Sequence, residues 1–433
     1  MKQNKLKTIQ LLLAHLSLFL VVLQTSTFLP TFVDEIVAIG STVNFLTSFD
    51  FQAEPLLSGS YSTSLTTGPL SSIGGSLGWV LSQDLQVSRV LNFYYVVLIS
   101  FFIFKSIISD KDISLFTLLS ISLLLIPWWF GVLYSIGEIV SMFVFISGIL
   151  YLNKNEKIAY FMLSSSIIFF KFSTILPMGI FLFFYILMKI IKREFRILNF
   201  LFFLTPMFIW GLMSSIKLGF SDGFKNIFDM FFYHLFHEGS GLNNFNLASV
   251  VELVKSSEVA NWSNASLVRI LLVPILFNFF LLKNRKLLNE KYIYLIYPLI
   301  YSNLFTYAWF WLSSPKKYIR YSQHFIVLVV FFSIYFLLSR LKISKFDKVI
   351  LVLIISTFFS SEILILLFFI TSLLFIFKNI KISSSLLIWF LILNNFNILF
   401  ENNTKDIQEL KFNECNKEIL DSDCVLKYLG IEY

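Results

Sequence analysis

Residues 9–29 read IQLLLAHLSLFLVVLQTSTFL, an apolar run without an Asp, Glu, Lys or Arg. A helix of about 20 such residues spans the hydrocarbon core of a bilayer. Lys2, Lys5 and Lys7 precede the run, and basic residues mark the cytoplasmic side of a first span. No small-residue cleavage pattern follows Leu29. The run is therefore predicted to be a retained anchor, with the N-terminus in the cytoplasm.

The composition extends this prediction to the whole chain. Of 433 residues, 57% are hydrophobic, 14% are charged and 53 are Phe, which an aqueous globule cannot bury. Apolar runs of spanning length recur as far as residue 400. The fold class is predicted to be an all-α polytopic membrane protein with about 13 transmembrane helices. After the first span, the predicted spans cover residues 90–107, 114–132, 134–152, 158–172, 173–190, 197–215, 267–282, 292–311, 323–339, 348–360, 362–377 and 384–400.

The net charge of +8 is explained by topology, because the basic residues form short clusters between apolar runs. A nucleic-acid partner is excluded on the same ground. Alternation of the spans puts these clusters in the cytoplasm and the long segments 31–88 and 216–265 in the periplasm. We expect one transmembrane domain over 1–400, a periplasmic tail over 401–433, and a place in a bacterial inner membrane. Within the tail, Cys415 and Cys424 could form a disulfide or remain thiols.

Two adjacent acids, Asp34 and Glu35, follow the first span directly. Carboxylates at the membrane face lose part of their hydration, which disturbs their pKa values and is typical of functional sites. Acids also simply mark the outer end of a helix or cap the next one, so this structural explanation stands beside the functional one.

The chain resembles the GT-C class of glycosyltransferases, which are multi-span enzymes using lipid-phosphate sugars. The likeness covers about 320 residues in order and spacing. It rests on the acidic pair and on these further motifs: Thr67-Gly68-Pro69-Leu70, Gly74-Gly75-Ser76-Leu77-Gly78, Ser88-Arg89-Val90-Leu91-Asn92, Leu133-Tyr134-Ser135-Ile136-Gly137-Glu138, Lys171-Phe172-Ser173-Thr174 and Arg320-Tyr321. Members of the class that act on protein or lipid A commonly carry Lys-Pro-Pro where this chain has Thr67-Gly68-Pro69. The acceptor is therefore left open among cell-envelope glycans, lipids and proteins.

The resemblance implies sugar transfer from a polyprenyl-phosphate donor on the periplasmic face. Such a reaction needs a base for the acceptor hydroxyl and cations for the departing phosphate. Asp34 is the predicted base, with Glu35 as a second base or an orienting partner. Direct displacement with one carboxylate near the acceptor inverts the anomeric centre.

The predicted phosphate and lipid ligands are four basic residues and one tyrosine at the outer membrane face. Arg320 is the first choice, because a guanidinium grips phosphate with two parallel hydrogen bonds. Lys171 stands among phenylalanines, where a lysine either snorkels or pairs with an anion. Arg89, Tyr321 and Lys316 complete this set, although Lys316 is also explained as a solvated surface charge. Glu138 is expected to support one of these cations.

A divalent metal stays open as a cofactor. His234 and His237 share one helical face at a spacing of three, but no third ligand is evident, and an amphipathic surface helix explains the same segment. The competing function is a transporter, flippase or polymerase of polyprenyl-linked glycans. A transporter predicts internal repeats and charges in mid-span, and the sequence shows neither clearly.

Overall fold

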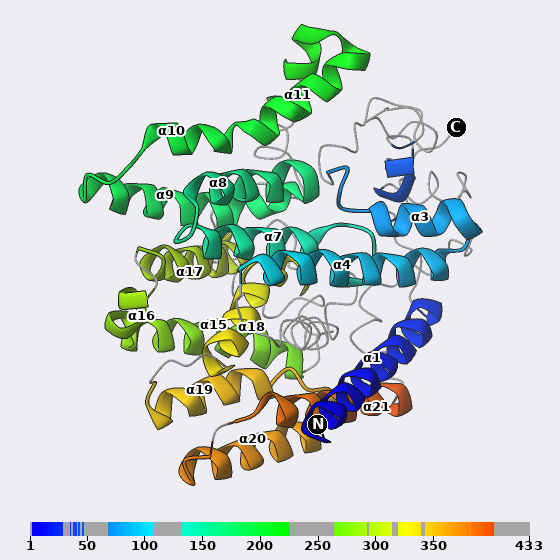
Figure 1. Cartoon of the computed structure of the whole chain (residues 1–433), viewed down its shortest axis with the longest axis vertical. Helices are drawn as coiled ribbons and strands as arrows, with labels where there is room; N and C mark the ends of the chain where they lie inside the picture. The colour runs from blue at the N-terminus through cyan, green and yellow to red at the C-terminus, as the bar shows by residue number, and fades with distance from the viewer. Residues whose placement is uncertain are drawn as a thin grey trace.

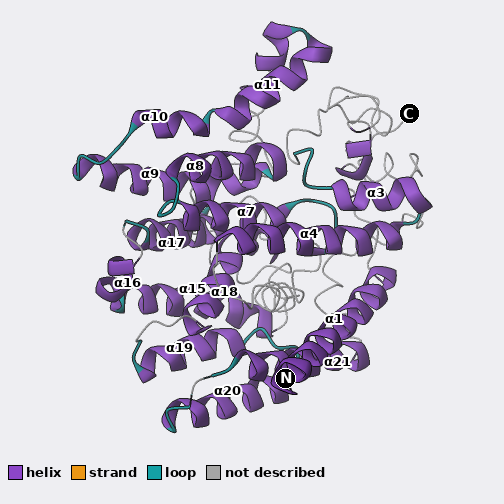
Figure 2. Ribbon diagram, viewed as in Figure 1, coloured by secondary structure: helices purple, strands orange, loops and turns teal. Residues whose placement is uncertain are grey.

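The computed structural model describes residues 2–28, 35, 38–40, 42–43, 46, 68–107, 132–225, 228, 264–291, 294–313, 319–338, 343–380 and 382–401. Over these residues the secondary structure is helical and contains no strand (Figure 2). The helices are α1 (Lys2–Phe28), α3 (Ile73–Ser82), α4 (Leu85–Ile107), α7 (Glu138–Tyr151), α8 (Glu156–Ser165), α9 (Ile175–Ile191), α10 (Ile197–Phe200), α11 (Thr205–Leu218), α15 (Asn264–Lys283), α16 (Arg285–Lys291), α17 (Ile296–Leu312), α18 (Gln323–Leu338), α19 (Lys345–Ser356), α20 (Glu362–Phe377) and α21 (Ser384–Glu401).

The chain is a polytopic membrane protein. Four helical segments in the described part are long and apolar enough to cross a bilayer, namely Thr8–Thr27, Leu85–Phe102, Phe172–Ile191 and Ile197–Ile216. Shorter apolar helices such as α7, α18 and α20 accompany them. Residues 114–131 of the predicted span 114–132 lie outside the described residues, so the total number of spans stays a prediction.

Two predicted boundaries differ from the structure. The second span was predicted to begin at residue 90, yet α4 begins at Leu85, and α3 precedes it and packs against it as a helical hairpin. Residues 134–137, predicted to be the start of a span, are not helical. Helix α7 begins only at Glu138, because Gly137 has a φ of 75°, in the left-handed region where glycine is favoured.

The helices pack into one bundle (Figure 1), in which central helices are buried and outer helices expose apolar side chains. In α7 every residue from Glu138 to Leu150 is buried, and α18 is buried along nearly its whole length. Helices that are apolar all round belong in the middle of a bundle. In contrast, outer helices expose large side chains such as Phe183, Ile216 and Ile363, as expected where the neighbour is lipid.

The first and last helices lie against each other. Asn395 of α21 donates to the hydroxyl of Ser17 on α1 at 3.0 Å, and Ser385 donates to Gln10 at 3.0 Å. These polar pairs replace hydrogen bonds that lipid cannot supply.

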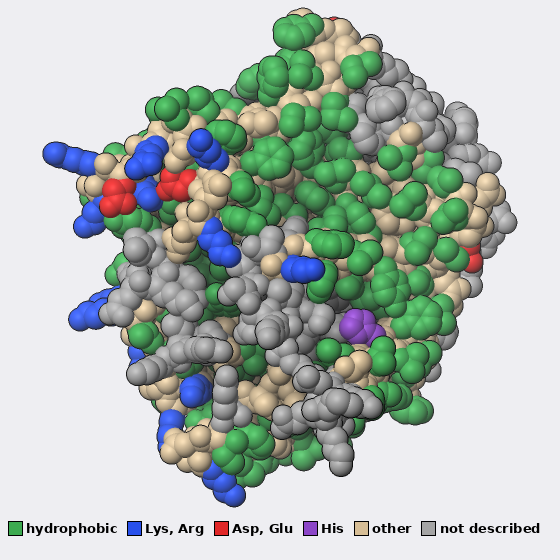
Figure 3. All heavy atoms as spheres, viewed as in Figure 1, with side chains coloured by type: hydrophobic (Ala, Val, Ile, Leu, Met, Phe, Trp, Pro, Cys, Tyr) green, Lys and Arg blue, Asp and Glu red, His purple; other side chains and the backbone are tan. Residues whose placement is uncertain are grey.

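The two ends of the bundle differ in charge. Lys and Arg side chains gather along the left edge of the molecule, where the connection between α9 and α10 and the helix α16 lie (Figure 3). Described basic residues of these connections include Lys154, Lys189, Arg196 and Arg285. The motif segments around Gly68, Gly137 and Lys171 occupy the other ends of the same helices. The basic connections and these motif segments therefore lie at opposite ends of the bundle.

Candidate functional site

The centre of the candidate site is a buried ion pair between Glu35 and Arg89. Arg89 Nη2 donates to Glu35 Oε2 at 2.9 Å, and Nε lies 3.2 Å and 3.3 Å from the two carboxylate oxygens. Arg89 Nη1 donates to the carbonyl of Ser26, near the end of α1, at 3.0 Å. The two side chains are 0% and 2% exposed. Burial raises the pKa of the Glu35 carboxyl, and the Arg89 charge and hydrogen bonds oppose that rise.

Glycines in α3 let α4 come close enough to place Arg89. A Cβ added at Gly74 would lie 2.8 Å from the Cα of Asn92, and one at Gly78 would lie 2.5 Å from the Cα of Ser88. These distances are shorter than real carbon contacts, so the helices pack backbone to backbone. Gln83 ends α3 in a left-handed conformation and lets the chain reverse into α4.

The segment between residues 132 and 137 is fixed to the same stretch of α4. Asn92 Nδ2 lies within hydrogen-bond distance of the carbonyls of Val132, Leu133 and Tyr134, the shortest being 3.1 Å to Tyr134. The Tyr134 ring lies under the Arg89 guanidinium, with its centroid 4.8 Å from Cζ. The ion pair is thus packed against the segment that leads to α7.

Glu138 lies where α7 and α18 begin. Its buried carboxylate accepts a hydrogen bond from Nε2 of Gln323, the first residue of α18. The Glu138 side chain therefore ties the start of α18 to the start of α7. Tyr321, only 9% exposed, lies two residues before Gln323 in a 3₁₀ turn that spans Ile319–Ser322.

Lys171 lies in a break between two helices. The turn Ser166–Phe170 is π-helical, Lys171 is extended at φ −145° and ψ 120°, and Phe172–Thr174 form a 3₁₀ turn before α9. Such π turns are common at functional sites. The side chain of Lys171 is 7% exposed. The break lies at the boundary between the predicted spans 158–172 and 173–190.

The segment after residue 67 is bonded to this break. Gly68 N donates to Phe170 O at 2.8 Å, and Leu70 N donates to Phe169 O at 2.9 Å. A Cβ at Gly68 would lie 2.3 Å from the carbonyl carbon of Phe169, which only glycine avoids. Gly137 also approaches Phe170 O and Ser71, so the segments carrying Gly68, Glu138 and Lys171 form one connected region.

No protein-family model matches the chain, and no curated protein matches it. Two solved structures share its fold, both crystal structures of ArnT from Cupriavidus metallidurans, which is a GT-C glycosyltransferase. The structure bound to undecaprenyl phosphate has a TM-score of 0.51 and 12% identity, over 90% of this chain and 76% of ArnT. The apo structure has the same TM-score and 11% identity, over 94% and 78%. The chain has the GT-C fold. The resemblance read from the sequence motifs is therefore confirmed at the level of fold.

In this GT-C fold, four sequence-predicted residues lie at the same end of the bundle: Glu35, Arg89, Glu138 and Lys171. Arg320 lies in the 3₁₀ turn before α18, and its side chain is outside the described part. Asp34, Lys316, His234, His237 and the two cysteines also lie outside the described residues. Within the described ranges, no group of three potential metal ligands is found.

The sequence motifs did not include one residue of the site, and they assigned no role to two others. Gln323 was not singled out, although a glutamine at the start of an apolar helix is a recognisable signal for a buried polar contact. Asn92 and Tyr134 stood inside quoted motifs, but their contacts with the 132–134 carbonyls and with Arg89 depend on how the GT-C fold brings α4 and α7 together.

Proposed function

We propose that the protein is a membrane glycosyltransferase that moves a sugar from a polyprenyl-phosphate donor to a cell-envelope glycan, lipid or protein on the periplasmic face. The observation that carries this proposal is the clustering of Glu35, Arg89, Glu138 and Lys171 at one end of a GT-C fold. ArnT, which shares the fold, has been crystallised with undecaprenyl phosphate.

In the proposed reaction, Asp34 takes the proton of the acceptor hydroxyl as the acceptor oxygen attacks the anomeric carbon. The bond from that carbon to the phosphate oxygen breaks, and the polyprenyl phosphate leaves with the electron pair. One displacement inverts the anomeric configuration. No metal is required for this sequence of steps, and a divalent ion would add charge compensation if one binds.

Glu35 and Arg89 are proposed to act as positioning residues. The two side chains are hydrogen-bonded to each other. The Arg89 guanidinium contacts the Glu35 carboxylate at 2.9 Å and the backbone carbonyl of Ser26 at 3.0 Å. This pairing supports the expected orienting role of Glu35. Arg89 was predicted to bind the donor phosphate. The pairing with Glu35 instead favours a role in which Arg89 anchors the segment that carries Asp34.

The charge of the leaving phosphate is assigned to Arg320 and Lys171, with Tyr321 and Lys316 beside Arg320. Cations placed where negative charge develops stabilise the transition state more than the ground state. Glu138 supports this group by holding Gln323, and through it the turn that contains Arg320 and Tyr321.

The reaction is tested with a panel of radiolabelled polyprenyl-phosphate sugars and an extract of envelope acceptors. We expect one donor to transfer its sugar, and NMR of the product to show the anomeric configuration opposite to that of the donor. A product with the donor's configuration would exclude direct displacement.

The face of the membrane is tested by cysteine labelling in a chain lacking Cys415 and Cys424. Gln83 is exposed in the turn between α3 and α4. The variant Gln83→Cys should react with a membrane-impermeant thiol reagent in cells with a permeabilised outer membrane. The matched control is Lys192→Cys, which lies at the other end of the bundle and should react only after lysis. The reverse pattern would place the site in the cytoplasm.

A further inference from the structure

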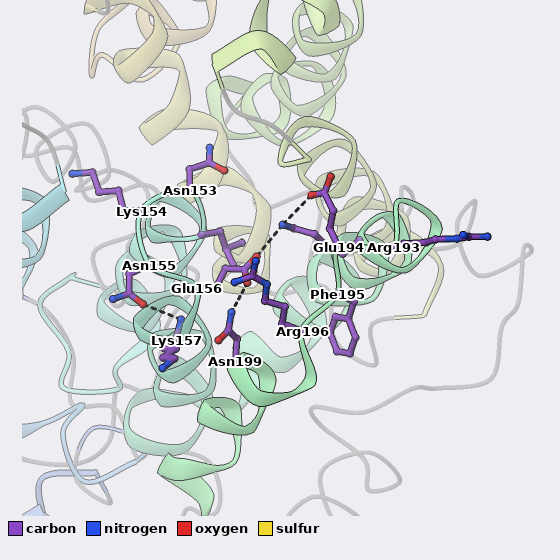
Figure 4. A pocket seen from close by; sticks show the side chains of 12 residues that line it. Asn153, Lys154, Asn155, Glu156, Lys157, Arg193, Glu194, Phe195, Arg196 and Asn199 are labelled. Atoms are coloured by element: carbon purple, nitrogen blue, oxygen red, sulfur yellow. Dashed lines mark hydrogen bonds and ion pairs between the residues drawn. The ribbon is translucent and has the colours of Figure 1, made fainter.

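A second polar site lies at the basic end of the bundle, away from the candidate active site. It is a pocket of about 780 Å³ formed by the connection between α7 and α8, the end of α9 and the start of α10 (Figure 4). Its lining comprises Leu152, Asn153, Lys154, Asn155, Glu156, Lys157, Lys189, Arg193, Glu194, Phe195, Arg196 and Asn199. Five of these residues are basic and two are acidic, so the lining has an excess of positive charge.

The two acids in this pocket share one lysine. Lys189 Nζ lies 3.0 Å from Glu156 and 3.5 Å from Glu194, between the two carboxylates. Asn199 and Tyr185 donate to Glu156 at 2.8 Å and 3.1 Å. Burial alone would raise the pKa of Glu156, but these hydrogen bonds and the Lys189 charge hold it below its ordinary value. The Glu156 carboxyl is therefore ionised, and one lysine lies between it and Glu194.

The remaining cations point to an anionic ligand. Lys157 and Arg196 form no ion pair with any acidic residue in the described part, whereas Arg193 extends away from the pocket (Figure 4). Arg196 extends beside Glu156 and Asn199 in the pocket (Figure 4). Such a surplus of cations in one concave site costs repulsion that an anion would relieve.

The pocket borders the lipid-facing surface of the bundle. Ile190 and Ile191, at the end of α9, are 53% and 69% exposed, and Leu198 of α10 is 71% exposed. The Lys157 ammonium lies 5.4 Å from the centroid of Phe202, which is itself 40% exposed. Charged and apolar surfaces thus meet here, as they do where a lipid headgroup joins its acyl chains.

The geometry points to a binding site for the phosphate headgroup of an anionic membrane lipid, with Arg196 and Lys157 as its cationic contacts and the exposed surface of α9 and α10 against its acyl chains. The recognised chemistry is a phosphate diester with no cationic group on its headgroup, and therefore with net negative charge, joined to two or more acyl chains. Basic pockets between transmembrane helices bind such headgroups. This inference is independent of the proposed glycosyl transfer at the other end.

Native mass spectrometry of the purified full-length protein with phosphatidylglycerol, cardiolipin or phosphatidylcholine tests the inference. The variant is Arg196→Gln together with Lys157→Gln. The matched control is Arg285→Gln together with Lys286→Gln, two exposed basic residues of α16 outside the pocket. Size-exclusion chromatography and the thermal midpoint confirm that each variant is folded.

We expect the wild type and the α16 control to retain an anionic lipid and to release phosphatidylcholine. The pocket variant should bind the anionic lipid about thirtyfold more weakly, since each basic residue near a headgroup contributes about fivefold. Equal retention by the pocket variant and the control would overturn the assignment. Displacement of the lipid by inorganic phosphate or glycerol phosphate at equal concentration would also overturn it, because the pocket would then bind a soluble anion.

Discussion

Breaking the Glu35–Arg89 pair is the sharpest perturbation of the candidate site. Arg89→Gln removes the guanidinium that lies 2.9 Å from Glu35 and leaves the carboxyl at 0% exposure. The same change removes the hydrogen bond to Ser26 O. Removing one member of a buried pair costs about 3–5 kcal/mol, because the other member stays desolvated. We expect Glu35→Gln to cost a similar amount, and both variants to lose turnover because the segment next to Asp34 is displaced.

The assay compares thermal unfolding in detergent with turnover of the accepted donor. The double variant Glu35→Leu, Arg89→Met replaces the pair by apolar side chains, which is often neutral for stability. We expect it to regain much of the lost thermal midpoint while turnover stays low, since the clamp on the Asp34 segment is gone. Lys105→Gln, an exposed change at the far end of α4, is the control and should affect neither quantity.

Two results would refute this reasoning. Single variants with wild-type midpoints would mean that the pair contributes nothing measurable to the fold. A double variant that regains turnover together with stability would mean that the pair only fills space and positions nothing.

Four further outcomes are expected. Asp34→Asn should lower turnover by roughly 10²–10⁴ with folding intact, and near-normal turnover would reject Asp34 as the base. Arg320→Lys keeps the charge but loses the two-pronged grip, so turnover should fall roughly tenfold to a hundredfold, and an unchanged rate would make Arg320 structural. Gly68→Ala should lower the thermal midpoint, because the new Cβ would overlap the backbone of Phe169. Gly179→Ala should not, because its Cβ would have no atom within 4 Å. Equal midpoints would show that the segment around Gly68 shifts without cost. The lowered pKa of Glu156 means that its carboxylate stabilises the fold at pH values above the ordinary pKa of the carboxyl. The difference in thermal midpoint between wild type and Glu156→Gln should therefore shrink as the pH falls through the pKa of Glu156 in the folded protein. A difference that grows in acid would contradict the hydrogen-bond network around Glu156.

The lengths of the apolar runs and the positions of the charged residues predicted the membrane fold, because both are local properties of the sequence. The first span, the boundaries of α18 and the break near Lys171 follow directly from run length and composition. Helix α3 was not predicted because Gly74, Gly75 and Gly78 are poor helix formers, whereas in the structure Gly74 and Gly78 are what allows contact with α4.

Pairing between residues was less predictable than their location. Glu35 and Arg89 are 54 positions apart, and nothing in their local sequence shows that they meet. Their types at a membrane face indicated a site, but only the tertiary arrangement shows that Arg89 is committed to Glu35. The same holds for Glu138 and Gln323, which are 185 positions apart.

The central claim is tested most directly by following the lipid carrier in proteoliposomes that contain the purified protein, a labelled polyprenyl-phosphate sugar and an acceptor extract. The account predicts release of free polyprenyl phosphate by the wild type and a release at least a hundredfold slower by Asp34→Asn. Transbilayer movement of the intact lipid-linked sugar without cleavage, at the same rate in both proteins, would contradict it and identify a transporter.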